Sequence, residues 1–88
     1  NIKFWGRNKI RQGLKQKHVS AQNIKLALNL IDPEKYIEVL KKLAIKKSKL
    51  IREKNKIKRK YKLMNYLLSK GYEADLILSV LKENTEND

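Results

Sequence analysis

Hydrophobic residues along this chain recur mainly three and four positions apart, the spacing that places them on one face of an α-helix. Capping and turn residues divide this pattern into five segments. Their apolar positions are, in order, Ile10 and Leu14; Ile24, Ala27, Leu28 and Ile31; Tyr36, Ile37, Leu40, Leu43 and Ala44; Ile57, Tyr61, Met64 and Leu68; and Leu76, Ile77, Val80 and Leu81. No alternating run bounded by turn residues predicts a strand. The sequence therefore predicts an all-α protein with at least five helices.

Capping residues set the expected limits of these helices. Ser20 and Asp32 carry side-chain oxygens that can accept hydrogen bonds from the free N–H groups of a first helical turn. Pro33 suits the first helical position, where its missing N–H costs no hydrogen bond. Gly71 suits the left-handed position that follows the end of a helix. We therefore expect one helix over about residues 7–17, one after Ser20, one from Pro33 towards residue 51, one that ends at Gly71, and one across residues 76–81.

Three helix starts also carry the spacing of a hydrophobic staple, in which an apolar residue before the cap packs on one at the fourth helical position. The pairs are Val19 with Ile24, Ile31 with Tyr36, and Tyr72 with Ile77. Staples fix the angle at which the chain enters each helix, so they indicate short corners and a packed bundle. The side chains that we expect to be buried are Ile10, Leu14, Ile24, Leu28, Leu40, Leu43, Met64, Leu67, Ile77 and Leu81.

Three of the six aromatic residues are also expected in this core. Tyr36, Tyr61 and Tyr72 fall on apolar stripes or staples. For Phe4 and Trp5, which precede the first helix, two roles stay open: they cap the bundle, or they pack on an upstream repeat. The alternative role for all of these rings is to stack on nucleic-acid bases.

Two parts of the chain resemble each other when the sequence is displaced by 53 residues. Most aligned pairs are identical and the others are conservative; they join Lys9, Ile10, Leu14, Lys17, Ala21, Ile24, Ala27 and Leu28 to Lys62, Leu63, Leu67, Lys70, Ala74, Ile77, Val80 and Leu81. A chance match in a chain rich in Lys, Leu and Ile is the alternative. The repeat predicts a three-helix repeat over residues 1–51 and the first helices of a second repeat over residues 52–83. Residues 84–88 lack hydrophobic side chains and are expected to form a disordered acidic tail.

The charge balance suggests a partner for this fold. The 88 residues contain 22 Lys and Arg against 9 Asp and Glu, a net charge of +13. Unpaired positive charge repels itself, and a polyanion relieves that repulsion. We therefore expect two basic blocks to bind nucleic acid: Arg7, Lys9, Arg11, Lys15 and Lys17 in the first, and Lys58, Arg59, Lys60 and Lys62 in the second. Lys lacks the bidentate geometry by which Arg recognises guanine, so we expect binding that does not depend on base sequence.

The surroundings of the two blocks strengthen this expectation. Residues 1–31 contain no Asp or Glu that could pair with the first block. The second block shares a helix with the apolar stripe of residues 57–68, which we expect to face the core, so its charged face should point outward. The alternative is that these basic residues serve only solubility.

Several other functions are excluded by what the chain lacks. It has no Cys, which excludes disulfides and thiolate-bound zinc. Its single histidine, His18, lies at an expected helix end, and its three glycines are too isolated for a phosphate-binding loop. No apolar run approaches the roughly 20 residues of a membrane span. We therefore expect a cytoplasmic protein that is not an enzyme and uses no metal or cofactor. Because the first residue is Asn1 rather than Met, we also expect a piece of a longer chain.

Two short motifs are familiar from a known family. An aromatic-Gly-basic-x-basic-Ile-x-x-x-Leu pattern lies within Phe4–Lys17 (FWGRNKIRQGLKQK). A leucine-rich, basic-Gly-aromatic pattern lies within Tyr66–Tyr72 (YLLSKGY), and Ile77 and Val80-Leu81 follow it. In this order and at this distance, the motifs resemble the openings of the second and last helical repeats of the RecX family. The resemblance covers about residues 4–83.

The resemblance implies tandem three-helix repeats and a role with the RecA recombinase in recombination, DNA repair and the SOS response. Family members bind RecA, its nucleoprotein filament and DNA, and generally inhibit filament growth, ATP hydrolysis and strand exchange. The chain departs from the family at His18, where Gly often ends the helix, and at Glu73, where a hydroxyl cap is usual. The family's first repeat and the last helix of its final repeat are not found, so the resemblance implies a C-terminal fragment.

Two classes of function stay open at this point. The first is a RecX-like regulatory protein that binds RecA and its DNA filament and inhibits the recombinase. The second is a helical module that binds single-stranded or duplex nucleic acid non-specifically, without a RecA partner. A structural fragment with an incidental basic surface is a third possibility. RecA ATPase activity on single-stranded DNA separates the first two, because only the regulator would lower it.

Overall fold

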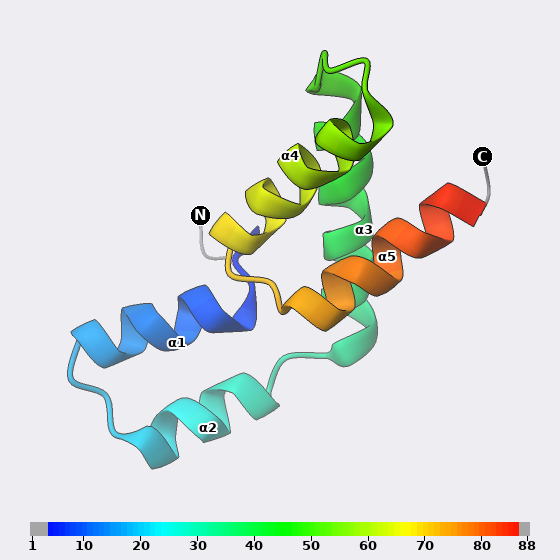
Figure 1. The fold of residues 1–88 in the computed structure, drawn as a ribbon. Helices are drawn as coiled ribbons and strands as arrows, with labels where there is room; N and C mark the ends of the chain where they lie inside the picture. The colour runs from blue at the N-terminus through cyan, green and yellow to red at the C-terminus, as the bar shows by residue number, and fades with distance from the viewer. Residues whose placement is uncertain (1–3, 87–88) are drawn as a thin grey trace.

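The computed structural model describes residues 4–86, with side chains as far as residue 82, and over that range it contains five α-helices and no strand. The helices are α1 (Arg7–Gln16), α2 (Ala21–Asn29), α3 (Pro33–Leu50), α4 (Lys56–Ser69) and α5 (Ala74–Glu86). The molecule is elongated, with principal extents of 44 × 23 × 20 Å (Figure 1). The predicted all-α class and the predicted order of helices are confirmed.

Side chains cap the helices where the sequence predicts them to do so. The Ser20 hydroxyl accepts a hydrogen bond from the N–H of Asn23 at 3.2 Å at the start of α2. The Asp32 carboxylate accepts one from the N–H of Glu34 at 3.0 Å at the start of α3. Asn55 caps α4 in the same way, although the sequence analysis did not single it out. Each of these caps satisfies N–H groups that would otherwise have no partner inside the helix.

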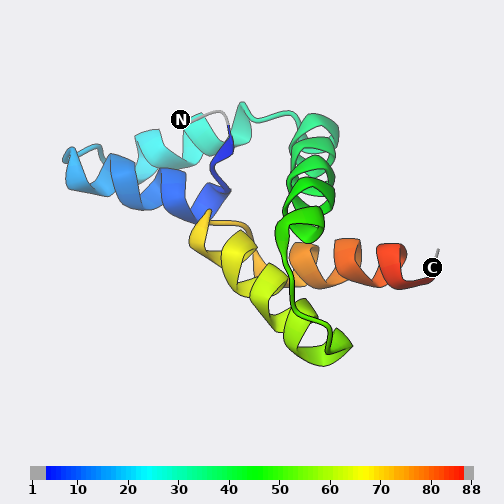
Figure 2. The same cartoon turned by 90° about the horizontal axis from the view of Figure 1, so that it is seen from above.

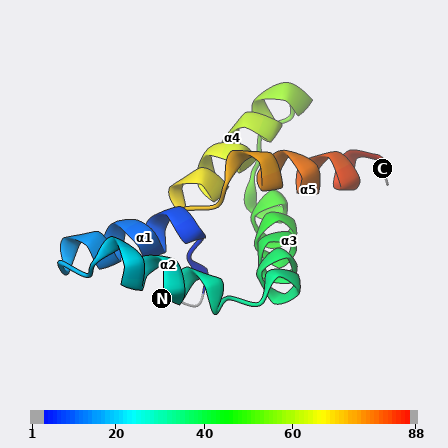
Figure 3. The same cartoon turned by 90° about the horizontal axis from the view of Figure 1, so that it is seen from below.

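The helices form two groups. Helices α1 and α2 lie side by side at one end of the molecule, whereas α3 lies against both α4 and α5. Views from above and from below show the same separation (Figures 2 and 3). The packing therefore groups α3 with the helices that follow it, whereas the predicted division at residue 51 groups it with those that precede it.

One hydrophobic core holds α3, α4 and α5 together and explains this grouping. Its buried members are Tyr36, Leu40, Ala44, Leu63, Leu67, Tyr72, Ile77, Val80 and Leu81. Burial of a Leu or Ile side chain contributes about 1.5–3 kcal/mol, so this cluster dominates the stability of the fold. The core depends on the apolar face of α3, and that face is turned towards α4 and α5 rather than towards α1 and α2.

The expected core residues are all at least half buried. Ile24, Leu40, Leu67, Ile77 and Leu81 are buried. The others are half-buried: Ile10, Leu14, Leu28, Leu43 and Met64. The acidic tail differs from its prediction, because α5 continues to Glu86 and residues 84–86 are therefore helical. Residues 87–88 lie outside the described range.

The prediction that the stripe of residues 57–68 on α4 faces the core is wrong for three of its four members, since only Met64 packs against the core. Leu63 and Leu67 enter the core, whereas Ile57 and Tyr61 are exposed. The expectation that Tyr61 is a core residue is therefore wrong as well. The helix carries two apolar stripes at helical spacing, and periodicity alone does not show which of them faces α3 and α5.

The turns α1–α2 and α4–α5 have the same construction. His18 and Gly71, which are 53 positions apart in the sequence, adopt positive φ angles of 61° and 93°. In both turns the residue that follows closes the helix: the N–H of Val19 bonds to the carbonyl of Leu14 at 3.0 Å, and that of Tyr72 to the carbonyl of Leu67 at 3.3 Å. These bonds are typical of a left-handed helix end. The repeat seen in the sequence thus corresponds to two equivalent helical hairpins.

Candidate nucleic-acid interface

The segment that leads into α1 is fixed against the turn between α4 and α5. The N–H of Gly6 donates a hydrogen bond to the carbonyl of Lys70 at 2.6 Å, and the N–H of Asn8 donates one to the carbonyl of Gly71 at 2.9 Å. The Tyr72 hydroxyl donates to the carbonyl of Phe4 at 3.0 Å. The two glycine-containing motifs that the sequence analysis singled out therefore contact each other.

Arg7 lies in an ionic cluster that joins α1, α3 and the start of α5. Its guanidinium group contacts the Glu73 carboxylate at 2.8 Å and lies 4.1 Å from the centre of the Tyr36 ring. The Tyr36 hydroxyl donates to the other Glu73 oxygen at 2.5 Å and accepts a hydrogen bond from the Arg7 N–H at 2.8 Å. Arg7 therefore has an acidic partner distant in sequence, and the expectation that the first basic block lacks one is wrong for this residue.

The protonation states within this cluster support one another. Burial alone would raise the pKa of Glu73, but the hydrogen bonds that Tyr36 and Arg7 donate outweigh it and lower that pKa. Burial and the hydrogen bond to Glu73 raise the pKa of the Tyr36 hydroxyl well above its ordinary value. Burial also raises the pKa of the neighbouring Tyr72 to about 12. At neutral pH the cluster thus consists of an anionic carboxylate with a phenol and a guanidinium group that donate to it.

A basic hollow of about 590 Å³ lies between α1 and α2. Arg7, Arg11 and Lys15 line it from α1, where they follow one another at intervals of one turn, and Lys25 lines it from α2. Part of its apolar lining comes from Ile24 and Leu28. Because Glu73 balances the charge of Arg7, the net positive charge of this basic hollow comes from Arg11, Lys15 and Lys25. The site prediction missed Lys25, which stands alone in the sequence and reaches the hollow only through the folding of the hairpin.

The other two members of the first block lie outside the basic hollow. The Lys9 amine lies 4.7 Å from the centre of the Trp5 ring, a cation–π contact within the segment that enters α1. Lys17 is exposed and follows the last residue of α1. The structure therefore brings three of the five predicted residues into one hollow and separates these two from it.

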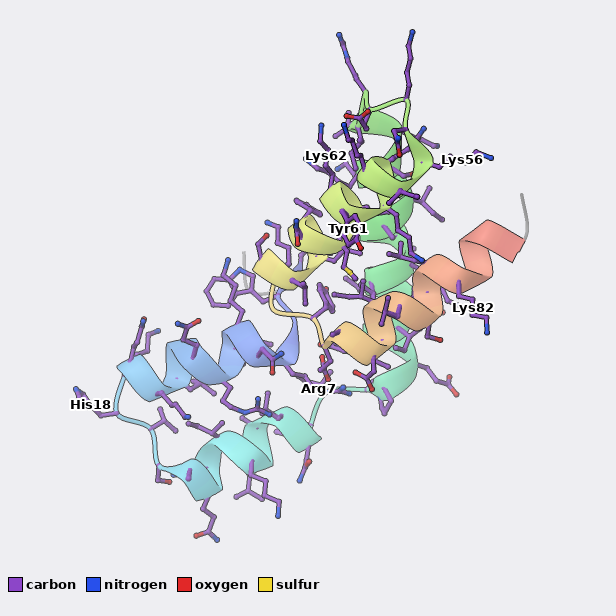
Figure 4. All side chains as sticks on the ribbon, viewed as in Figure 1. Arg7, His18, Lys56, Tyr61, Lys62 and Lys82 are labelled. Carbon is purple, nitrogen blue, oxygen red and sulfur yellow. The ribbon has the colours of Figure 1, made fainter. Side chains whose placement is uncertain are left out.

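The second block consists of residues with different environments. Lys62 pairs with Glu53 at 3.5 Å, and the Arg59 guanidinium donates to the carbonyl of Ser48 at 2.7 Å. The Arg59 contact connects α4 with the end of α3, and the Lys62 contact connects it with the segment between the two helices. Lys58 and Lys60 are exposed on α4, and Figure 4 shows Lys56, Tyr61 and Lys62 along the same helix.

A second hollow of about 590 Å³ lies beside this block, between the end of α3 and α4. Its lining includes Lys47, Arg52, Lys62 and Tyr66. The Lys47 amine lies 4.7 Å from the centre of the Tyr66 ring. The site prediction missed Lys47 and Arg52. The only signal for them was that they flank the end of the third predicted helix.

These features define an all-α protein of paired helical hairpins with a basic hollow at each end. None of the described helices is long and apolar enough to cross a membrane. The chain belongs to the RecX family: the family's second three-helix domain matches residues 1–28 and its third three-helix domain matches residues 34–81. The second of these matches includes α3 together with α4, in agreement with their packing.

Individual relatives agree with this assignment. The chain is 40% identical to the regulatory protein RecX of Clostridium tetani, in an alignment that covers 99% of the chain and 41% of the relative. It is 39% identical to the regulatory protein RecX of Clostridium perfringens (strain 13), over 99% of the chain and 42% of the relative. It is 44% identical to the regulatory protein RecX of Clostridium botulinum (strain Eklund 17B), over 93% of the chain and 40% of the relative. The chain thus spans about two fifths of the length of these relatives. No solved structure gives a significant match.

Proposed function

We propose that this chain is the part of a RecX-type regulator that binds the RecA recombinase and its DNA filament and lowers recombinase activity. Family membership and the name of its relatives, regulatory protein RecX, support this role. The role requires no catalytic residue and no cofactor, and it would be carried out in the cytoplasm, where recombinase and DNA occur together.

The basic hollow is the observation that carries the DNA-binding part of this proposal. Arg11 and Lys15 face Lys25 across the gap between two helices, and Ile24 provides an apolar wall beside them. An apolar wall lowers the local dielectric constant, so phosphate groups would be attracted more strongly here than by the same charges on an open surface. Contacts of this kind position a nucleic-acid backbone and do not distinguish bases.

The remaining basic residues would extend the contact with the backbone. Lys9 lies on α1 and Lys17 directly follows it, both outside the hollow, and Lys58 and Lys60 are exposed on α4. Arg59, Lys62 and Arg7 would contribute mainly through the local structure that their hydrogen bonds and ion pairs maintain.

RecA ATPase activity on single-stranded DNA tests the proposal. We expect the chain to lower the ATPase rate, and we expect a variant with Arg11→Ala, Lys15→Ala and Lys25→Ala to require a higher concentration for the same effect. The control variant Lys35→Ala, Lys42→Ala and Lys82→Ala removes the same number of exposed charges from other surfaces. If the chain binds DNA but leaves the ATPase rate unchanged at saturation, it is a nucleic-acid-binding module without a RecA partner.

A further inference from the structure

One apolar face of α4 is largely exposed, and Met64 is the member of it that packs against the core. This face consists of Ile57, Tyr61, Met64 and Leu68, spaced by four, three and four residues, and we call it the α4 face. Ile57, Tyr61 and Leu68 are 69%, 61% and 42% exposed, and Met64 is half-buried. Isolated apolar residues on a surface are ordinary, but several that share one helix face mark an interaction site.

Three of the four equivalent positions in the first hairpin are polar or charged instead. Displacement by 53 residues aligns the four members of the α4 face with Phe4, Asn8, Arg11 and Lys15. The same displacement aligns Leu78 of α5, which is 45% exposed, with Lys25 of α2. The three positions that supply positive charge to the basic hollow are therefore all apolar in the second hairpin. Packing against the core accounts for Met64 but not for Leu68 and Leu78, which are exposed.

The borders of the α4 face indicate the charge of what binds to it. Lys56, Lys58 and Lys60 are exposed around its first two members. These lysines favour a partner whose own apolar surface is bordered by Asp and Glu, because opposite charges around an apolar contact steer the partner and fix its register. They disfavour a second copy of this chain, which would bring the same Lys residues and a net charge of +13.

We infer that the α4 face is a protein-docking surface and that its occupant is an amphipathic helix bordered by acidic residues. The inference deepens the proposed function and rests on it for the identity of the partner: the recombinase would supply this helix while the basic hollow binds DNA. Aliphatic side chains favour a protein over bases, since Ile57, Met64 and Leu68 offer no ring for stacking. An amphipathic helix that lies in an apolar groove is an established mode of recognition.

Two synthetic helical peptides test the chemistry of the α4 face without RecA. Both carry the same apolar stripe; one has Glu at its borders and the other has Lys. We expect the 88-residue chain to bind the Glu peptide, and the variant Ile57→Ser with Tyr61→Ser to bind it at least about tenfold more weakly, as truncation of interface anchors does. The variant Leu26→Ser with Leu30→Ser removes two exposed apolar residues, one in α2 and one directly after it, and should bind normally.

A charge-reversal variant tests the borders separately. Lys56→Glu, Lys58→Glu and Lys60→Glu change only exposed residues, so the helical circular-dichroism signal should be preserved. We expect this variant to prefer the Lys peptide to the Glu peptide. Equal binding of both peptides by the unaltered chain, or Glu-peptide binding that survives the Ile57→Ser and Tyr61→Ser changes, would overturn the inference. The inference would be overturned equally if the unaltered chain bound phosphatidylserine vesicles or itself instead of the Glu peptide, and the Ile57→Ser and Tyr61→Ser variant lost that binding.

A RecA experiment distinguishes this inference from the proposed function. With the Ile57→Ser and Tyr61→Ser variant, we expect DNA binding to be unchanged and the effect on RecA ATPase to be lost. If the unaltered chain has no effect on RecA but still binds the Glu peptide through the α4 face, the proposed function fails and the docking surface stands. If the variant affects RecA as the unaltered chain does, the α4 face is not where RecA binds.

Discussion

The backbone of Gly6 lies directly against the backbone of Gly71, so that the start of α1 contacts the turn between α4 and α5. A Cβ atom at Gly6 would meet the carbonyl group of Gly71 and the nitrogen of Tyr72 at distances that real side chains do not reach. Because these obstacles are backbone atoms, they can move only if the two segments separate. This close approach gives a physical reason for both glycines in the two motifs.

Replacement of Gly6 by Ala should therefore destabilise the protein by about 2 kcal/mol or more, as overpacking against rigid neighbours does. Urea unfolding followed by circular dichroism measures this change. Gly13→Ala is the matched control, since a Cβ there would lie 3.5 Å from the Trp5 ring, an ordinary contact. In the interior of α1 that change should stabilise by about 0.5–1 kcal/mol. Equal effects of the two changes would contradict the close approach.

The Arg7–Tyr36–Glu73 cluster should stabilise the junction of the two hairpins. Glu73→Ala leaves a guanidinium group and a buried phenol without their acceptor, so we expect the free energy of unfolding to fall by about 1–3 kcal/mol. Glu38→Ala, at an exposed position of α3, should change it by no more than about 0.5 kcal/mol. Similar losses for the two variants in urea unfolding would show that the cluster has no special role.

The pH dependence of stability provides a separate test of the same cluster. The folded-state pKa of Glu73 lies below the ordinary value of 4.5, so its contribution is complete above 4.5 and is lost as the pH falls through the folded-state pKa. Tyr72, next to the cluster, has the opposite pH dependence: its folded-state pKa is raised from 10.0 to about 12, so its contribution to the free energy of unfolding is complete below pH 10 and declines as the pH rises towards 12. The difference in unfolding free energy between wild type and Glu73→Gln should therefore narrow below pH 4.5. A difference in unfolding free energy that stays constant down to pH 3 would show that the folded state does not favour the ionised form of Glu73.

Salt dependence tests the basic hollow as a phosphate site. Replacement of Arg11, Lys15 and Lys25 by Ala should reduce the slope of log K against log salt on duplex DNA by up to about 2.7, which corresponds to about 0.9 for each phosphate that is no longer neutralised. Fluorescence anisotropy with labelled DNA at several salt concentrations measures the slope. The Lys35, Lys42 and Lys82 control should change it less. If both triple variants reduce the slope equally, binding follows net charge and not the hollow.

His18 holds a left-handed conformation that glycine adopts without cost. His18→Gly should therefore stabilise the α1–α2 turn by about 0.5–1 kcal/mol, whereas His18→Ala should bring no gain because Ala keeps the steric penalty at positive φ. Thermal unfolding of the two variants provides the comparison. Stabilisation by Ala as large as that by Gly would mean that the turn does not have this conformation.

Features that depend on neighbours in the sequence could be predicted, and features that depend on distant segments could not. The caps at Ser20 and Asp32 and the left-handed Gly71 follow from local chemistry, because a helix end is satisfied by adjacent residues. The buried face of α4 did not follow, since Leu63 and Leu67 form one helical stripe and the α4 face forms another. Only contact with α3 and α5 selects between them.

In the candidate site, too, the contacts between distant segments could not be predicted. Arg11 and Lys15 are visible in the sequence as a basic block, but Lys25 joins them only when α2 folds back on α1. The ion pair between Arg7 and Glu73 was equally hidden, because the two residues occupy opposite ends of the chain. The one available signal was that Glu73 replaces the usual hydroxyl cap next to a glycine motif.

The uneven distribution of buried side chains has a consequence for the motions of the molecule. Among the described residues, Ile24 is the one buried hydrophobic side chain that α1 and α2 contribute. Regions with few buried apolar contacts open at a lower free energy than the core, in cooperative units that amide hydrogen exchange can resolve. The amides of α1 and α2 should therefore exchange through a partial opening that leaves α3 protected. An anion held between these two helices would be detected first as slower exchange in this hairpin, before any amide of the core responds.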